Sequence, residues 1–163
     1  MNNTPLTALG YNMLKDELHR LKTIDRPEVI QAISEARAQG DLSENAEYDA
    51  AKEKQGFIEG RILELESKLS TALVIDPSSL EKDGRVVFGV WIKLIDLDNE
   101  ENFVYQIVGD DEADIKHSKI SVSSPIARAL IGKMEGDVAE FTVPSGVREV
   151  EILQVVYADP KTI

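Results

Sequence analysis

The sequence predicts an α+β protein of two parts: an antiparallel coiled-coil hairpin over residues 1–76, then a mostly antiparallel β-sheet domain with one short helix over 77–163. Composition predicts the division. Up to about residue 73 the chain is rich in Ala, Glu, Leu, Lys and Arg, which favour helices, whereas beyond residue 77 it is rich in Val, Ile and aromatic residues, which favour strands. Asp76-Pro77-Ser78-Ser79 breaks the helical pattern and is typical of a linker.

The apolar residues of the first part follow the 4-3 spacing of a coiled coil. The spacing is kept by Leu14, Leu18 and Leu21 and, later, by Ile58, Ile62, Leu65, Leu69 and Ala72. It breaks near Pro27 and resumes with Ile30, Ile33 and Arg37, so we expect the proline to bend the first helix or shift its register. The short segment 39–43 forces the two helices to run antiparallel, which places the tip near 40–45. Arms of roughly 30 residues would be roughly 45 Å long.

Five segments beyond the linker have strand composition. They are 85–88, 90–97, 102–108, 138–143 and 147–157. Asp98-Asn99 marks a hairpin turn. A short helix fits Pro125 to Ile131, with the proline in its first turn and Gly132 at its end.

The overall charge excludes several classes of function. The chain of 163 residues carries 30 acidic and 18 basic side chains, a net charge of −12, and no cysteine. Thiol catalysis, disulfides and cysteine-based metal sites are therefore excluded. An acidic surface repels free duplex nucleic acid, so a protein partner must hold this chain wherever it acts near nucleic acid. Without a signal sequence or an apolar run of about 20 residues, we expect a soluble cytoplasmic protein that does not attach to membranes.

Asp41 and Glu44 lie three residues apart where the chain enters the second helix. One interpretation is a capping box, in which each carboxylate accepts a backbone N–H at the start of the helix. The other is that two carboxylates at the end of the hairpin are offered to Mg²⁺, which accepts one or two protein carboxylates besides water and phosphate oxygens. Two acids are too few for a self-sufficient two-metal nuclease, but they could complete a metal site that belongs to a partner. The two interpretations are compatible.

Residues 32–48, with Gly40-Asp41-Leu42-Ser43-Glu44-Asn45-Ala46-Glu47-Tyr48 at their end, closely resemble the tip signature of the Gre transcript cleavage factors. Residues 55–62 resemble the returning helix of that family, and 108–114 and 120–133 resemble its C-terminal domain. The resemblance spans nearly the whole chain. It favours the GreA branch over GreB, because the hairpin lacks a dense basic face.

The resemblance implies an FKBP-like C-terminal domain that docks on the rim of the RNA polymerase secondary channel, while the hairpin reaches the active centre. Asp41 and Glu44 would then help to hold a second Mg²⁺, shared with the polymerase, and position the water that cleaves the backtracked RNA near its 3′ end. Ser43 stands where many relatives carry a basic residue, which bears on how strongly the tip engages metal or RNA. The chain would be a monomer without a stably bound cofactor, and a stimulator of another enzyme.

Other residues have both a functional and a plainer interpretation. By resemblance, Arg37, Lys52 and Lys54 contact RNA phosphates or the polymerase; otherwise they form a solvated helix face. Tyr48 either lies near the catalytic end or packs the tip. The run Ser123-Ser124-Pro125 matches the family's docking loop, although it also fits an ordinary helix start.

Three alternatives remain open at this stage. An inhibitory paralogue of the same family would enter the same channel without promoting cleavage, and the intact Asp41 and Glu44 argue against it. A coiled-coil adaptor would not need paired tip acids. An FKBP-like isomerase or chaperone would need an aromatic-lined pocket, and we expect none, because some of the few aromatic residues must fill the core. Those residues are Phe88, Trp91, Phe103, Tyr105, Phe141 and Tyr157.

Overall fold

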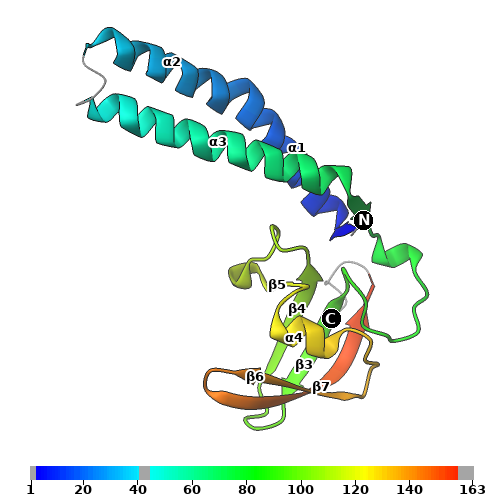
Figure 1. Cartoon of the computed structure of the whole chain (residues 1–163). Coiled ribbons are helices and arrows are strands. Elements are labelled where there is room, and N and C mark those ends of the chain that lie inside the picture. Colours follow the sequence, from blue (N-terminus) through cyan, green and yellow to red (C-terminus); the bar gives the residue numbers. More distant parts are fainter. Residues whose placement is uncertain (1–2, 41–44, 158–163) are drawn as a thin grey trace. The chain divides into compact units, whose positions relative to one another are not determined.

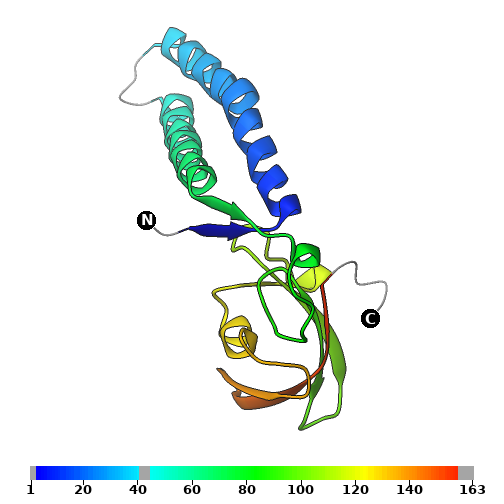
Figure 2. The same ribbon diagram turned by 90° about the vertical axis from the view of Figure 1, so that its right-hand side faces the viewer.

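A computed structural model describes residues 3–40 and 45–157, and it confirms the two-part α+β organisation (Figures 1 and 2). Within these residues the chain divides into a helical unit, 11–72, and a sheet unit formed by 3–10 together with 73–157. The hairpin part was expected to span 1–76; the structure instead groups residues 3–10 with the sheet unit. Each unit is described by itself below.

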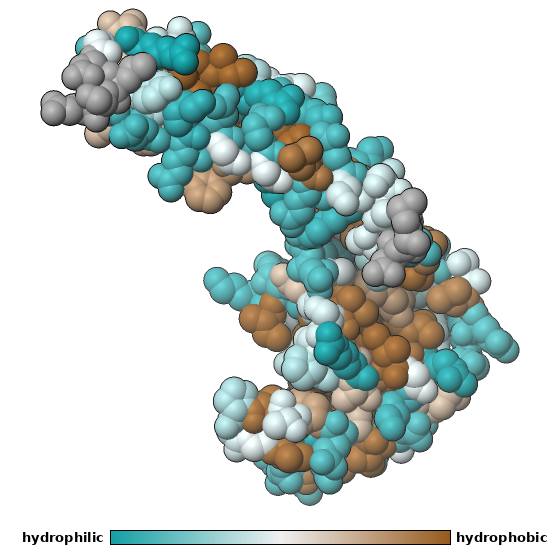
Figure 3. Space-filling view, in the orientation of Figure 1, coloured by the Kyte–Doolittle hydropathy of each residue, from teal (hydrophilic) through white to brown (hydrophobic). Residues whose placement is uncertain are grey.

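The helical unit is an antiparallel hairpin, as both views show (Figures 1 and 2). Its first arm consists of α1 (Ala8–Arg20), a π-helical turn η1 (Leu21–Asp25) and α2 (Arg26–Ala38), and its second arm is the single helix α3 (Ala46–Ser70). Two bidentate ion pairs join the arms. Arg26 donates to both carboxylate oxygens of Glu59 at 2.8 and 2.7 Å, and Arg61 donates to those of Glu17 at 2.7 and 2.9 Å. Hydrophilic residues dominate the visible face of the hairpin (Figure 3).

The π-helical turn shows how the expected interruption at Pro27 is made. The backbone N–H of Arg26 donates to the carbonyl of Leu21, five residues earlier, so the turn holds one residue more than an α-helical turn. The buried positions beyond the turn therefore lie one residue later in the chain than a plain heptad continued from Leu21 would place them. Val29 is 2% exposed, whereas Ile30 is 52% exposed. The expected continuation through Ile30 and Arg37 is wrong, because both are exposed and Val29 and Ala36 are buried instead; Ile33 is partly buried, as expected.

The sheet unit contains a mixed five-stranded sheet in the order β5-β4-β3-β7-β6. Its strands are β3 (Trp91–Asp96), β4 (Asn102–Val108), β5 (Lys119–Ser121), β6 (Val138–Val143) and β7 (Gly146–Val156). All neighbours are antiparallel except β4 and β5, which are parallel. A two-stranded sheet pairs β1 (Thr4–Leu6) with β2 (Ala72–Val74), and 3-10 turns η3 (Pro77–Ser79) and η4 (Ile115–His117) lie in the connections.

Most of the predicted elements are confirmed, and one is wrong. The strands at 102–108 and 138–143 have the predicted bounds, and α4 (Pro125–Leu130) begins at the predicted proline. Residues 85–88 form no strand, because only Arg85 bridges to Met134. Val86 and Phe88 are nevertheless buried, so this segment contributes side chains to the core without joining the sheet. The three-residue strands β1, β2 and β5 were not predicted.

The core of the sheet unit lies between the sheet and α4. Ala127 and Leu130 of α4 are fully buried against side chains from the central strands. Within this core, the strand residues with no exposed surface are Ile92, Leu94, Ile107, Val150 and Ile152. Because α4 is only six residues long, about 9 Å, it covers part of this sheet face and leaves the remainder less enclosed.

Candidate functional site

The two helices of the hairpin are fixed at the tip by Gly40 and Asn45. Gly40 follows α2 with a φ of +116°, a conformation that L side chains rarely adopt. Asn45 is the N-cap of α3: its Oδ1 accepts the backbone N–H of Tyr48 at 3.0 Å. Its Nδ2 donates to the carbonyl of Ala36 at 2.7 Å, so one side chain caps the second helix and holds the end of the first.

This geometry corrects one interpretation of the tip. A capping box at Asp41 would start the helix immediately after that residue, whereas α3 starts at Ala46 and Asn45 is its cap. The predicted metal-binding residues Asp41 and Glu44, with Ser43 between them, lie outside the described residues. Described residues on both sides of them are held together by the Asn45–Ala36 hydrogen bond.

The predicted RNA-contacting residues flank the tip on both helices. The Arg37 guanidinium lies 6.0 Å from the centre of the Tyr48 ring, a cation–π contact between the last turn of α2 and the first turn of α3. Tyr48 is half-buried, which agrees with tip packing. Lys52 and Lys54 are exposed on α3, and the Lys52 ammonium contacts the Gln55 side chain at 3.2 Å.

The predicted docking residues form a compact polar cluster at the start of α4. Ser124 is the N-cap of α4 and Pro125 is in its first turn; the Ser124 hydroxyl accepts the N–H of Ala127 at 3.3 Å. The Ser123 hydroxyl donates to Asp110 at 2.8 Å, and Ser121 donates to the same Asp110 oxygen. The ordinary role of helix start is therefore present, and Ser123 and Pro125 are also exposed.

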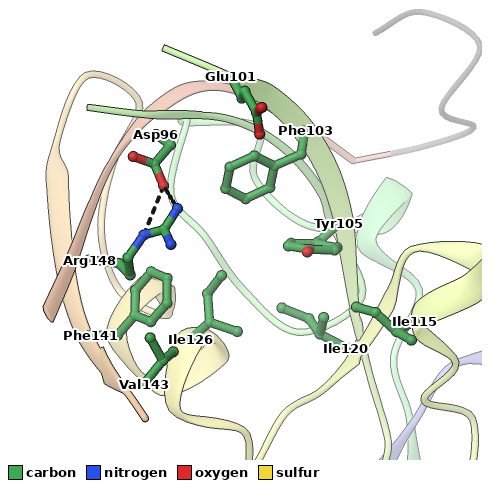
Figure 4. A pocket seen from close by; sticks show the side chains of 10 residues that line it. All are labelled: Asp96, Glu101, Phe103, Tyr105, Ile115, Ile120, Ile126, Phe141, Val143 and Arg148. Carbon is green, nitrogen blue, oxygen red and sulfur yellow. Dashed lines mark hydrogen bonds and ion pairs between the residues drawn. The ribbon is translucent and has the colours of Figure 1, made fainter. Parts of the chain in front are cut away.

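A pocket of about 470 Å³ lies beside this cluster on the sheet face that α4 leaves uncovered (Figure 4). Its apolar wall includes Phe103 and Tyr105, whose rings meet edge to face at 5.2 Å, together with Phe141. The remaining lining residues are Asp96, Glu101, Ile115, Ile120, Ile126, Val143 and Arg148. The expectation of no aromatic-lined pocket is thus wrong.

An ion pair closes one side of this pocket. Asp96 is 2% exposed, and one of its oxygens accepts from the Arg148 guanidinium, as the dashed lines in Figure 4 show. Its other oxygen accepts the backbone N–H of Asp98 at 2.8 Å. The Arg148 hydrogen bond, followed by that backbone N–H, holds the pKa of Asp96 below its ordinary value. The Asp96 carboxylate therefore stays ionised, paired with Arg148, beside the apolar wall that includes Phe103 and Tyr105.

Residues 3–40 and 45–157 contain no group of three or more His, Asp or Glu side chains that could hold a metal ion. Within the same ranges, no helix combines the length and apolar character needed to cross a bilayer.

Both units match models of one protein family. Residues 4–74 match the model described as "Transcription elongation factor, N-terminal", and residues 81–157 match "Transcription elongation factor, GreA/GreB, C-term". The chain belongs to the GreA/GreB family of transcription elongation factors.

Full-length relatives agree with this assignment. The transcription elongation factor GreA of Ralstonia nicotianae is 66% identical over 157 residues, which cover 96% of this chain and 99% of the relative. GreA of Neisseria meningitidis serogroup B is 62% identical with the same coverage. Among solved structures, the GreA factor homolog 1 of Thermus thermophilus is 31% identical and covers 94% of this chain and 99% of its own, with a TM-score of 0.44.

Two residues that organise the candidate sites of this GreA/GreB family member were not predicted from the sequence. Asn45 has a strong N-cap preference, and this signal was available directly before the helical run. Asp110 gave no comparable signal, because it meets Ser121 and Ser123 only once β5 pairs with β4.

Proposed function

We propose that this chain inserts its hairpin into the secondary channel of bacterial RNA polymerase and stimulates the polymerase's own Mg²⁺-dependent cleavage of backtracked RNA. Membership of the GreA/GreB family across both units is the observation that carries the proposal. The curated relatives are named transcription elongation factors. The chain would rescue arrested complexes as a stimulator, not as an enzyme in its own right.

The hairpin has the form that such a role requires. At 1.5 Å per residue, the 25 residues of α3 extend about 37 Å. The bidentate pairs of Arg26 with Glu59 and of Arg61 with Glu17 fix the two arms against each other along this length. Near the tip the seam narrows to Ala36 and Ala51, both buried, so that the arms approach closely. A slender, stiffened pair of helices is suited to a confined channel.

Asp41 and Glu44 fit a shared magnesium site by the chemistry of their donors. Carboxylate oxygens are ligands that Mg²⁺ prefers, and two of them leave positions for water, phosphate oxygens and carboxylates of the polymerase. When bound, the ion would polarise the attacking water and stabilise charge on the phosphate. Gly40 and Asn45 hold the two ends of the tip segment, and Arg37, Lys52 and Lys54 would attract the phosphates near the RNA 3′ end.

The sheet unit would dock on the rim of the channel through Ser123, Ser124 and Pro125. Asp110 fixes the Ser123 hydroxyl, so that this corner is ordered before it meets a partner. Ile126, the next residue of α4, continues the same surface into the apolar pocket, which would take an apolar side chain of the rim. Protein–protein docking also accommodates the net charge of −12.

The proposal is tested with backtracked elongation complexes that carry end-labelled RNA. Added protein and Mg²⁺ should shorten the transcript only when polymerase is present. Asp41→Asn and Glu44→Gln should abolish shortening while leaving polymerase binding nearly unchanged. Glu47→Gln, at an exposed acid in the first turn of α3, is the charge-matched control and should retain activity.

The docking half is tested separately by Ser123→Ala with Asp110→Ala, which should weaken polymerase binding first. Tip variants that lose binding and cleavage together would contradict the division of roles. Suppression of intrinsic cleavage by the unaltered protein would refute stimulation and identify an inhibitor that occupies the channel.

A further inference from the structure

A basic groove lies on the helical unit at the end opposite the tip. It measures about 430 Å³ and is formed where α1 and η1 face the last turns of α3. Its lining consists of Tyr11, Lys15, Leu18, His19, Lys22 and Leu69 and includes no carboxylate. This composition is unusual in a chain with 30 acidic and 18 basic side chains.

Two of the three basic groups in the groove have no carboxylate partner among the described residues. Most arginines of the hairpin are paired with acids, as Arg26 is with Glu59. Lys15 instead lies 5.3 Å from the centre of the Tyr11 ring, and His19 is exposed. Lys22 meets Glu66 at 3.3 Å, but both side chains are more than 40% exposed, and such surface pairs exchange readily for another anion.

The spacing of these groups suits successive phosphates along the backbone of a nucleic-acid strand. Lys15, His19 and Lys22 follow one helix face in steps of four and three residues, which spreads them over about 10 Å. A single phosphate is shorter than this row. The ring of Tyr11, with Leu18 and Leu69 beside it, provides an apolar surface on which a base or sugar packs, as in proteins that bind single strands.

We infer that this groove binds the backbone of single-stranded nucleic acid through Lys15, His19 and Lys22, with Tyr11 contacting a base. An acidic peptide would use the positive charges but not the aromatic ring beside them. The inference does not depend on the proposed action on polymerase, since it concerns the opposite end of the hairpin and is tested without polymerase.

The test is fluorescence anisotropy of a labelled 12-nucleotide single-stranded RNA with the full chain, at several salt concentrations. Lys15→Gln should weaken binding about tenfold at low salt, as expected for the loss of one charged hydrogen bond. It should also reduce the slope of log affinity against log salt by about 0.7, the value for one phosphate contact on a single strand. Lys133→Gln, at an exposed lysine of the sheet unit, makes the same charge change and should leave both quantities unaltered.

Two further measurements separate a strand from a simple anion. Tyr11→Leu keeps the charge and an apolar side chain, and should still weaken RNA binding severalfold because it removes the stacking surface. Inorganic tripolyphosphate should compete poorly with the RNA. An equal loss with Lys133→Gln, no effect of Tyr11→Leu, or tripolyphosphate competing as well as an unlabelled strand would each overturn the inference. Circular dichroism of every variant establishes that it is folded.

Discussion

Replacing Asn45 by alanine should loosen the tip without unfolding the hairpin. The change removes two interactions of one side chain: the cap on the Tyr48 N–H at 3.0 Å and the hydrogen bond to the Ala36 carbonyl at 2.7 Å. An Asn-to-Ala change at an N-cap costs about 1 kcal/mol, and a further hydrogen bond contributes about 1 kcal/mol. We therefore expect local opening at the start of α3 to become about 2 kcal/mol easier, about a 30-fold change in the opening equilibrium.

Hydrogen exchange of the Tyr48 amide measures this opening directly, because that N–H is the group that Asn45 caps. Asn45→Asp is the matched control. Its carboxylate still caps the helix, but it cannot donate to Ala36, so only about half of the effect should remain. Stimulation of RNA cleavage should fall more with Asn45→Ala than with Asn45→Asp, while both variants still bind the polymerase.

Two outcomes would refute this reasoning. Unchanged exchange of the Tyr48 amide in Asn45→Ala would mean that the cap does not hold the start of α3. An Asn45→Asp variant that exchanges like the unaltered protein would mean that the hydrogen bond to Ala36 contributes nothing to the tip, because that bond is the one interaction this variant is designed to remove.

Three further predictions concern stability. Val29→Ala should lower the unfolding free energy of the hairpin by roughly 1–3 kcal/mol and Ile30→Ala by less than about 0.5 kcal/mol, because only Val29 is buried; urea unfolding followed by helical circular dichroism compares them. Gly40→Ala should cost roughly 1–3 kcal/mol from its backbone conformation, since no atom of the described residues beyond its chain neighbours lies within 4 Å of the added Cβ. Fraying of the end of α2 in hydrogen exchange would report this cost. Arg148→Met should lower the melting temperature most at pH 7. The pKa of Asp96 is depressed in the folded protein, so the stabilisation by the Asp96–Arg148 pair is present above pH ~4 and is lost as pH falls through the folded pKa. A difference in melting temperature between the variant and the unaltered protein that stayed constant down to pH 3 would contradict this.

Elements with a regular pattern were predictable, and those fixed by distant contacts were not. Strands β4 and β6 have seven and six residues. Segments of this length, rich in β-branched and aromatic residues, are long enough for composition and spacing to predict where the strand begins and ends. Segment 85–88 has the same composition, but it lies between glycines with positive φ, Gly84 and Gly89, and pairs only at Arg85. Strand β5 has three residues, too few to show a period, and it exists because β4 supplies its partners.

The candidate sites follow the same rule. The tip motif is local, so a site there could be predicted from the sequence, and the roles of Asp41 and Glu44 stay a prediction. The second partner of Asn45, the Ala36 carbonyl, could not be predicted, because it lies nine residues away across the hairpin. The pocket was missed because the aromatic residues were counted as core fillers. Phe88 and Tyr157 do fill the core, whereas Phe103, Tyr105 and Phe141 are only partly buried on the face that the short α4 leaves open.

The π-helical turn links the stability of the hairpin to the chemistry of its tip. A plain heptad continued from Leu21 would place Glu28 and Glu35 against α3 and bury charges in the seam. The extra residue of η1 places Ala36 there instead and leaves Arg37 exposed, 6.0 Å from the Tyr48 ring. A feature more than ten residues from the tip thus determines which side chains the tip presents.

The same turn also accommodates Pro27. A deletion separates this role of the turn from its role in setting which residues face α3. Thr23 is exposed, and its hydroxyl donates to the backbone carbonyl of His19. Removing Thr23 would convert η1 to a regular turn and keep Val29 and Ala36 in the seam. Pro27 would then lie inside a continuous α-helix, where its ring opposes the preceding turn at a cost of about 3 kcal/mol. Deletion of Thr23 alone should therefore destabilise the hairpin, and Pro27→Ala should restore it. Failure of the second change to rescue the first would show that the π turn is required by the seam and not by the proline.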